Sequence, residues 1–300
     1  MAAKDARIGL RILELPALNF SIPDDSFLLD GTYSTTLTEE LKLQNPISKI
    51  RESITKSDGC NDSIDNSINY EEFKRIWFPD VNAHVFISHS HVDKAKAIAL
   101  ANFLFSKFGI RSFVDSEVWG YMDDALRELN NKHNKFPGQE NTYIYEHCNK
   151  LASNLNMILS SALIKMIHES ECLIFINTID SCVRDGDEFR TQSPWIFTEL
   201  LMSSMLEKSE HKDRPTELRK SLDEFRVVAA NESFDQAVFS YPLYLRHMHN
   251  VTNDKINKIN AIKPSGLSFT TTCYRDTAHH FEVDDVFKNL DSIYNLVISR

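Results

Sequence analysis

The chain has 300 residues, enough for one large domain with an accessory segment or for two domains. Its 43 acidic and 33 basic residues give a formal net charge of −10, and the basic residues are scattered, which argues against a nucleic-acid partner. The eight glycines are so widely spaced that neither G-x-G-x-x-G nor G-x-x-x-x-G-K-[ST] occurs. A Rossmann dinucleotide turn and a Walker phosphate loop are therefore excluded.

The cysteines and the apolar runs indicate a cellular location. Five cysteines, an odd number with no C-x-x-C, argue against a disulfide framework or a zinc ribbon and favour reduced thiols. The first twenty residues lack the apolar core of a secretion signal. The apolar runs are also too short to span a bilayer. We therefore expect a cytoplasmic protein with no membrane partner.

The first 81 residues show no strong hydrophobic period. A short apolar stretch near Ile8 to Leu18 precedes turn-rich sequence, and the stretch from Ser57 to Asn69 is dense in Ser, Asn and Asp. We interpret residues 1–81 as an N-terminal accessory segment and residues 82–300 as the main domain.

The character of the sequence changes at residue 82. The run from His84 to Ser88 (HVFIS) predicts a short buried strand. A helix follows, with one apolar stripe from Ala97 to Phe108, and Gly109 is expected to end it. The run from Ile110 to Val114 predicts a second strand. Strand, helix and strand in about thirty residues make a βαβ unit.

The same alternation continues to the C-terminus. Helices are predicted around Leu151–Met166, from the Ser193-Pro194 start signal onward, and over Val283–Val297; strands are predicted at Cys172–Asn177, Phe225–Ala230 and Ser268–Tyr274. A non-periodic insert at about 120–149 interrupts the pattern. Alternating short apolar strands and helices predict an open, doubly wound parallel α/β sheet of five strands.

Four motifs in order carry a family resemblance. They are HVFISHSHVD (84–93), IRSFVDS (110–116), Ser160-Ser161-Ala162 before CLIFIN, and Trp195-x-x-x-Glu199 within SPWIFTEL. Together they resemble the TIR (Toll/interleukin-1 receptor) domain family, of the stand-alone bacterial type. The resemblance implies a flavodoxin-like fold over residues 82–300. The insert at 120–149 is longer than is usual in that family, and it lacks the familiar Pro-Gly at the expected place.

The resemblance also implies a function. The enzymes of the family cleave NAD+ at the nicotinamide–ribose bond, and the glutamate of W-x-x-x-E is their catalytic residue, which makes Glu199 the candidate here. Bacterial relatives are often antiphage-defence proteins that deplete NAD+ or make an ADP-ribose-derived signal for a downstream effector protein. NAD+ would be the substrate, with no further cofactor, and a homo-oligomer formed through TIR–TIR contacts is expected.

The placement of the motifs agrees with this chemistry. Trp195 and Glu199 are four residues apart and share one helix face. The carboxyl ends of parallel strands meet at one edge, where open α/β sheets build their clefts. The predicted substrate-binding residues gather at that edge: His89, Ser90, Asp115, Trp119 and Trp195. A fixed carboxylate there stabilises an oxocarbenium-like ribose, and Trp119 offers a π face to the nicotinamide ring.

Competing interpretations stay open. A helical Trp-x-x-x-Glu is more often a packed Trp with a solvated Glu. His89 and His91 alternate as metal ligands do, but no third ligand is evident, so we predict loop histidines and no metal. The alternative function is a non-catalytic TIR adaptor or scaffold. A third hypothesis is a different sugar–base-cleaving enzyme that acts on a free nucleotide.

Overall fold

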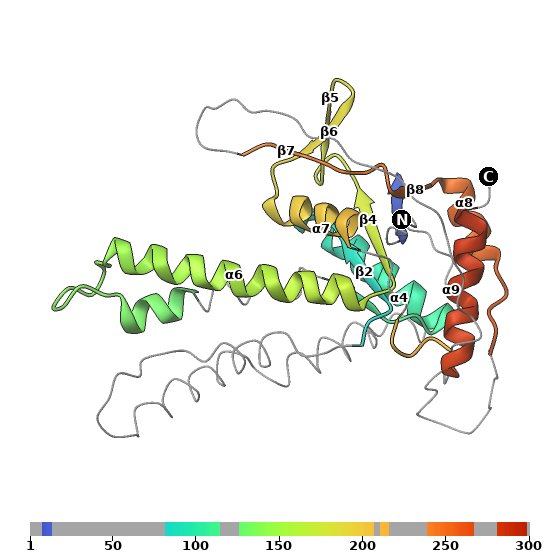
Figure 1. Cartoon of the computed structure of the whole chain (residues 1–300), viewed down its shortest axis with the longest axis horizontal. Coiled ribbons are helices and arrows are strands. Elements are labelled where there is room, and N and C mark those ends of the chain that lie inside the picture. The colour runs from blue at the N-terminus through green and yellow to red at the C-terminus, as the bar shows by residue number, and fades with distance from the viewer. Residues whose placement is uncertain are drawn as a thin grey trace, which may run out of the picture. The chain divides into compact units, whose positions relative to one another are not determined.

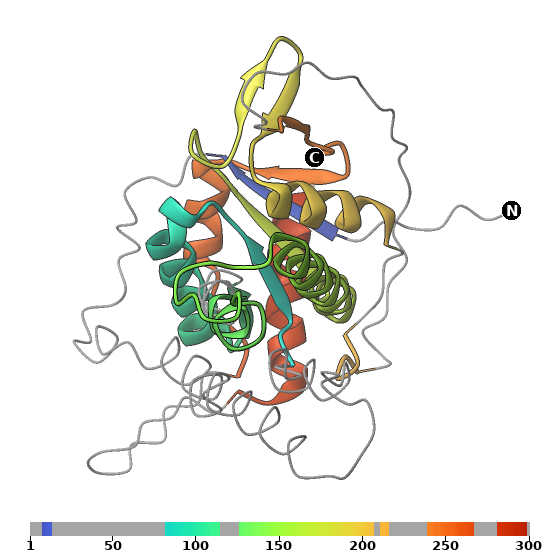
Figure 2. The same ribbon diagram turned by 90° about the vertical axis from the view of Figure 1, so that its left-hand side faces the viewer.

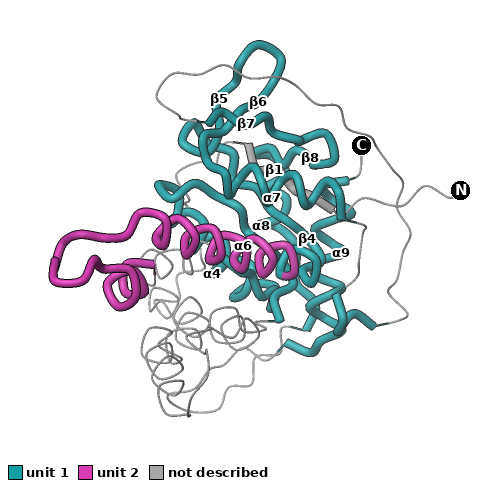
Figure 3. The backbone as a smooth tube through the Cα atoms, turned by 60° about the vertical axis from the view of Figure 1, so that its left-hand side comes forward, with its two compact units in different colours: residues 1–34, 82–115, 166–300 teal, residues 35–81, 116–165 magenta. Residues whose placement is uncertain are grey.

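The structure is a computed structural model of the 300-residue chain, and it describes residues 8–13 (backbone only), 82–114, 126–206, 211–215, 239–266 and 281–298. These residues form a mixed α/β architecture (Figure 1). The chain divides into two compact units (Figure 3). Unit 1 comprises Met1–Ser34, Asn82–Asp115 and Met166–Arg300, and unit 2 comprises Thr35–Val81 and Ser116–Lys165. The predicted boundary at 81/82 stays a prediction, and each of the two units includes residues from both sides of it.

The main sheet belongs to unit 1, and every strand pair in it is parallel. Its strand order is β3-β2-β4-β1-β8. The strands are β1 (Ile8–Leu13), β2 (Val85–Ser88), β3 (Ser112–Val114), β4 (Cys172–Asn177) and β8 (Met248–Val251). The prediction of a parallel sheet in an α/β chain is thus confirmed, and β2, β3 and β4 lie where the apolar runs placed them.

The other two strands come from unexpected segments. Strand β1 lies between β4 and β8, although its residues were assigned to the N-terminal accessory segment. Strand β8 was not predicted. The strands predicted at 225–230 and 268–274 lie outside the described residues.

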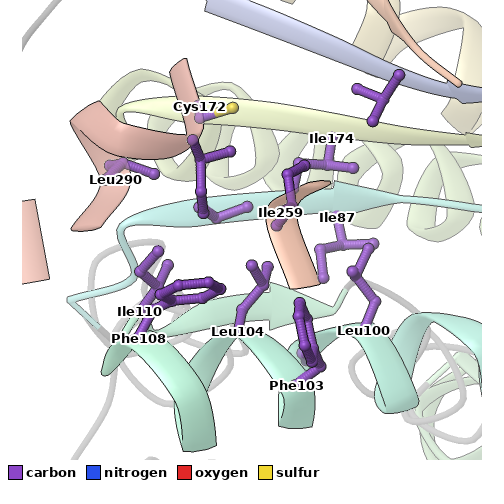
Figure 4. Close-up of a cluster of buried hydrophobic side chains, with 14 of the residues drawn as sticks. Ile87, Leu100, Phe103, Leu104, Phe108, Ile110, Cys172, Ile174, Ile259 and Leu290 are labelled. Carbon is purple, nitrogen blue, oxygen red and sulfur yellow. The ribbon is translucent and has the colours of Figure 1, made fainter. Parts of the chain in front are cut away.

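Three helices cover one face of this sheet: α4 (Lys94–Phe108), α8 (Asn253–Ala261) and α9 (Val283–Ile298) (Figure 2). Their apolar stripes pack on alternate residues of the strands, as the two-residue period of a strand requires. Figure 4 shows this core, with side chains from the strands and from the helices, among them Ile87, Leu100, Phe103, Leu104, Phe108, Ile174, Ile259 and Leu290. The predicted stripe of α4 is confirmed, and the helix ends at Gly109 as expected.

Helix α7 (Pro194–Met205) lies on the opposite face from α4 and α8 (Figure 2). The predicted start signal is confirmed, because Ser193 accepts a hydrogen bond from the Ile196 amide and Pro194 is the first helical residue. A small antiparallel sheet adjoins α7 and consists of β5 (Val183–Asp185), β6 (Glu188–Thr191) and β7 (Tyr241–Pro242). The Phe197 ring of α7 stacks on Tyr241 with centroids 4.9 Å apart.

Unit 2 is described over residues 126–165. A helical segment at 126–133 is followed by a connection with a β-bridge between Lys135 and Tyr143 and then by α6 (Tyr145–Glu169), whose last residues belong to unit 1. Part of the predicted non-periodic insert at 120–149 is therefore helical. Among the helices in the described ranges, none has the length and apolar character that a bilayer crossing needs.

Candidate functional site

The predicted catalytic carboxylate lies on the buried face of α7. Glu199 shares that face with Ile196, Leu200 and Ser203, and its exposed fraction is 0%. Trp195, one turn earlier on the same helix, is half-buried. A glutamate is rarely buried completely, because taking a carboxylate out of water costs free energy that other groups must offset. The competing interpretation of a solvated helical Glu is therefore wrong for this residue.

The chain that leaves β2 carries the next two predicted residues. His89 and Ser90 are both buried directly after the strand. The His89 Nδ1 atom lies 3.4 Å from the Ile87 carbonyl oxygen, and Ser90 caps the short 3-10 helix η1 (His91–Asp93) by accepting from the Asp93 amide over 3.3 Å. Tight local bonding holds this turn at the carboxyl end of β2.

Asp93 is the centre of the polar network at this edge. Its side chain has no exposed surface, and three donors surround the carboxylate. Oδ2 accepts from the Ser90 hydroxyl at 2.6 Å and from the Thr178 hydroxyl, and Oδ1 accepts from Lys96 Nζ at 2.6 Å. Because Thr178 directly follows β4, this one carboxylate joins the carboxyl ends of two neighbouring strands.

The donors also set the charge state of Asp93. Burial by itself would raise the pKa of the carboxyl group. The hydrogen bonds from Lys96, Ser90 and Thr178, together with the Lys96 charge, outweigh burial and hold the pKa below its ordinary value. The network therefore presents a permanently ionised, fully hydrogen-bonded aspartate at neutral pH.

Two polar residues near this edge were not predicted as site residues. Asp93 lies within the HVFISHSHVD motif but was not selected, because its partner Thr178 is 85 positions further along the chain. Ser88 ends β2, and within the described residues its buried hydroxyl has no hydrogen-bond partner. Ser88 alternates with Ile87, which faces the α4 core, so Ser88 points to the face that α7 covers. An unsatisfied buried hydroxyl there is an unused donor and acceptor.

His247 contacts α7 at Ser203, one turn beyond Glu199. The Ser203 hydroxyl lies 2.8 Å from His247 Nε2 and also donates to the Leu200 carbonyl oxygen at 2.8 Å. Since the hydroxyl has one hydrogen, His247 is the donor of their shared bond. Burial and the neighbouring His249 lower the pKa of His247 to about 4, so the imidazole is neutral at pH 7.

The remaining predictions lie partly beyond the described structure. Asp115 and Trp119 fall outside the described residues, so their expected convergence with His89 and Ser90 stays a prediction. Within the described ranges, no group of three or more His, Cys, Asp or Glu side chains is placed to hold a metal ion.

Comparisons with known proteins give no assignment. No protein-family model matches the chain, no curated protein matches it, and no solved structure matches it. The family resemblance therefore remains a prediction that rests on the four sequence motifs.

Proposed function

We propose that the chain is a TIR-type enzyme that cleaves NAD+ between nicotinamide and ribose, with Glu199 as the catalytic carboxylate. The observation that carries the proposal is the complete burial of Glu199 on the inner face of α7. Burying a carboxylate in such a position lowers the stability of the fold. Costly buried carboxylates of this kind are typical of catalytic sites. The parallel α/β sheet is compatible with the flavodoxin-like fold that the proposal implies, but β1, the first of the described strands, takes the fourth place in the sheet, where the flavodoxin-like order has a later strand.

The reaction needs little more than a fixed negative charge. Nicotinamide leaves NAD+ as a neutral base, so no strong general acid is required, and the ribose becomes an oxocarbenium-like cation. A carboxylate excluded from water stabilises that cation more strongly than a hydrated one does. Glu199 would supply this charge. The unused hydroxyl of Ser88, on the face that α7 covers, is a candidate hydrogen-bonding group for the substrate.

Burial has a consequence for access. Because the Glu199 side chain has no exposed surface, NAD+ reaches it only after neighbouring groups move. We therefore expect low turnover in dilute protein and higher turnover where self-association or an activating signal rearranges the site. The product, whether it depletes NAD+ or is an ADP-ribose-derived signal for an effector, would serve antiphage defence in the cytoplasm.

The test is nicotinamide release from NAD+ by the full chain over a range of protein concentrations. Glu199→Gln keeps the shape of the side chain and removes its charge. We expect turnover to fall roughly 10²–10³-fold, the loss seen when a preorganised electrostatic group is removed. Glu282→Gln, at an exposed glutamate before α9, is the matched control and should retain full turnover. Equal activity of wild type and Glu199→Gln would contradict the assignment.

One observation favours the alternative function, a non-catalytic scaffold. Val92 and Ile179 are 73% and 78% exposed, and they adjoin Asp93 and Thr178, which are hydrogen-bonded to each other. Two exposed apolar side chains thus flank the carboxyl edge of the sheet, where a second copy would find an apolar contact. Self-association without nicotinamide release in concentrated protein would favour the scaffold.

A further inference from the structure

A continuous series of hydrogen bonds leads from Asp93 toward α7. It starts with the Thr178 hydroxyl, which donates to Asp93 Oδ2 and accepts from the Ser181 amide over 3.3 Å. The Ser181 hydroxyl accepts from the Thr178 amide at 2.8 Å and donates to the Thr178 carbonyl oxygen at 3.0 Å. The turn after β4 is thereby closed on itself and tied to the turn after β2.

The series continues through Thr191, the last residue of β6. Its hydroxyl donates to the Ser181 carbonyl oxygen at 2.8 Å and accepts from the Ser193 amide at 3.1 Å. Ser193 in turn caps α7, because its hydroxyl accepts from the Ile196 amide over 3.3 Å. We call these five residues the Asp93–Ser193 relay: Asp93, Thr178, Ser181, Thr191 and Ser193.

Burial and bonding give the relay little freedom. Asp93, Ser181 and Thr191 are all buried. Each of the hydroxyls of Thr178, Ser181 and Thr191 donates one hydrogen bond and accepts another. Buried hydrogen bonds linked in this way polarise and strengthen one another. A shift at one member therefore breaks bonds at its neighbours.

We infer that Thr191 is a positioning residue that fixes the first turn of α7, and with it Glu199, against the carboxyl ends of β2 and β4. This inference rests on the proposed function. Glu199 follows the cap residue Ser193 by six positions, about 9 Å along a rigid helix. A rotation or fraying of the capped turn therefore changes where the carboxylate points. The relay couples that turn to Asp93, which lies in the connection that follows β2.

Thr191 can be tested with substitutions that separate shape from hydrogen bonding. Thr191→Val keeps the shape and removes both hydroxyl bonds, whereas Thr191→Ser keeps the hydroxyl. Thr198→Val is the matched control, because the Thr198 hydroxyl bonds within α7 to the Pro194 carbonyl oxygen at 2.7 Å and is not part of the relay. Two quantities are measured for each full-length variant: amide hydrogen exchange at Ile196 and Phe197, and kcat and KM for NAD+.

We expect Thr191→Val to speed exchange of those two amides roughly tenfold, the effect of losing two hydrogen bonds that each contribute modestly to stability. Its kcat should fall by a similar factor while KM changes less than about twofold, since the carboxylate acts in the transition state. Thr191→Ser should restore both values, and Thr198→Val should leave both unchanged. If Thr191→Val does not fold, Thr178→Val interrupts the same relay and should give the same pattern.

The outcomes distinguish this inference from the proposed function. Unchanged exchange in Thr191→Val would overturn the inference whatever the activity is. Faster exchange with unchanged kcat would also overturn it, because the relay would then hold the helix without positioning Glu199. If the wild-type chain releases no nicotinamide at all, the proposed function fails, and the positioning of Glu199 for that reaction fails with it. The exchange data then still decide whether Thr191 holds α7.

Discussion

Individual buried titratable residues in this chain are stabilised in opposite charge states by their partners. Asp93 keeps its charge because Lys96, Ser90 and Thr178 donate to it. His84, just before β2, is kept neutral: its Nδ1 accepts from the Arg111 amide at 3.0 Å, and its ring lies 4.7 Å from His211 and 5.3 Å from Phe287. Burial, then the nearby His211 and Arg111, lower the pKa of His84 from 6.5 to about 3, although Asp213 opposes them.

His84 therefore makes stability depend on pH. Between about pH 6.5 and pH 3 the unfolded chain binds a proton at His84 that the folded chain does not bind, so the free energy of unfolding falls as the pH is lowered through this range. From pH 7 to pH 5 the loss amounts to about 2 kcal/mol at most. His84→Asn should be less sensitive to pH by this amount in urea titrations at the two pH values.

The control for this comparison is a variant that removes no titratable group. Thr198→Val, on α7, should keep the pH dependence of the wild-type chain. If the pH dependence of His84→Asn equals that of wild type, a neutral buried His84 is ruled out.

At the scale of the elements, α4 depends on the residue that ends it. Gly109 has φ +69°, and its amide donates to the carbonyl oxygens of Leu104 and Phe105. A Cβ added there would lie 2.6 Å from Phe281 Cγ, so a side chain has no room. Gly109→Ala combines backbone strain with a steric clash, and we expect it to lower the free energy of unfolding by about 2–4 kcal/mol, measured by urea denaturation.

A second glycine, Gly186, separates the effect of backbone strain from that of the steric clash. It has φ +61° in the β5–β6 connection, and no atom lies within 4 Å of an added Cβ. Gly186→Ala should therefore cost only the backbone strain, about 1 kcal/mol. An equal loss in the two variants would show that the contact with Phe281 is unimportant.

The same scale shows what sequence reasoning finds and misses. β2, α4 and β3 were predicted because the hydrophobic periodicity of a βαβ unit and the glycine that ends its helix are visible in the local sequence. β1 was missed because its partners, β4 and β8, are distant in the sequence, and its own residues carry no sign of that pairing. The β5–β6 hairpin did have a local signal, the Asp185-Gly186 pair between two short strands, and it was not used.

The candidate site divides in a similar way. Glu199 and Ser90 were selected from local motifs, and the structure shows both buried. The role of Asp93 could not be predicted from the sequence, because it depends on the hydroxyl of Thr178, which lies in a different strand connection. Hydrogen bonds between turns that are distant in the sequence form only in the tertiary structure, so no local sequence pattern predicts them.

At the scale of the whole molecule, Arg214 joins three segments of unit 1. Its guanidinium binds Glu171 before β4, with Nε 2.9 Å from Oε2, and Asp291 of α9, with Nη2 2.9 Å from Oδ1. The cation also lies 5.0 Å from the centre of the Phe287 ring. Arg214 and Glu171 are both buried, so their charges depend on each other for compensation.

Removing one partner should therefore be costly. Arg214→Met leaves Glu171 buried without its cation, and we expect the free energy of unfolding to drop by about 3–5 kcal/mol in urea titrations. Adding Glu171→Gln should recover part of this loss, because the uncompensated charge is then removed. A double variant no more stable than Arg214→Met would contradict this explanation.

The position of β1 also shapes how the protein is made. This strand leaves the ribosome before its two neighbours, β4 and β8, which begin at Cys172 and Met248. The sheet of unit 1 therefore cannot assemble strand by strand during synthesis, because β1 must wait until both of its partners have emerged. Long-range pairing of this kind is slow and leaves strand edges uncovered in the meantime. Dependence on chaperones during translation is the expected consequence of placing an early strand between two later ones.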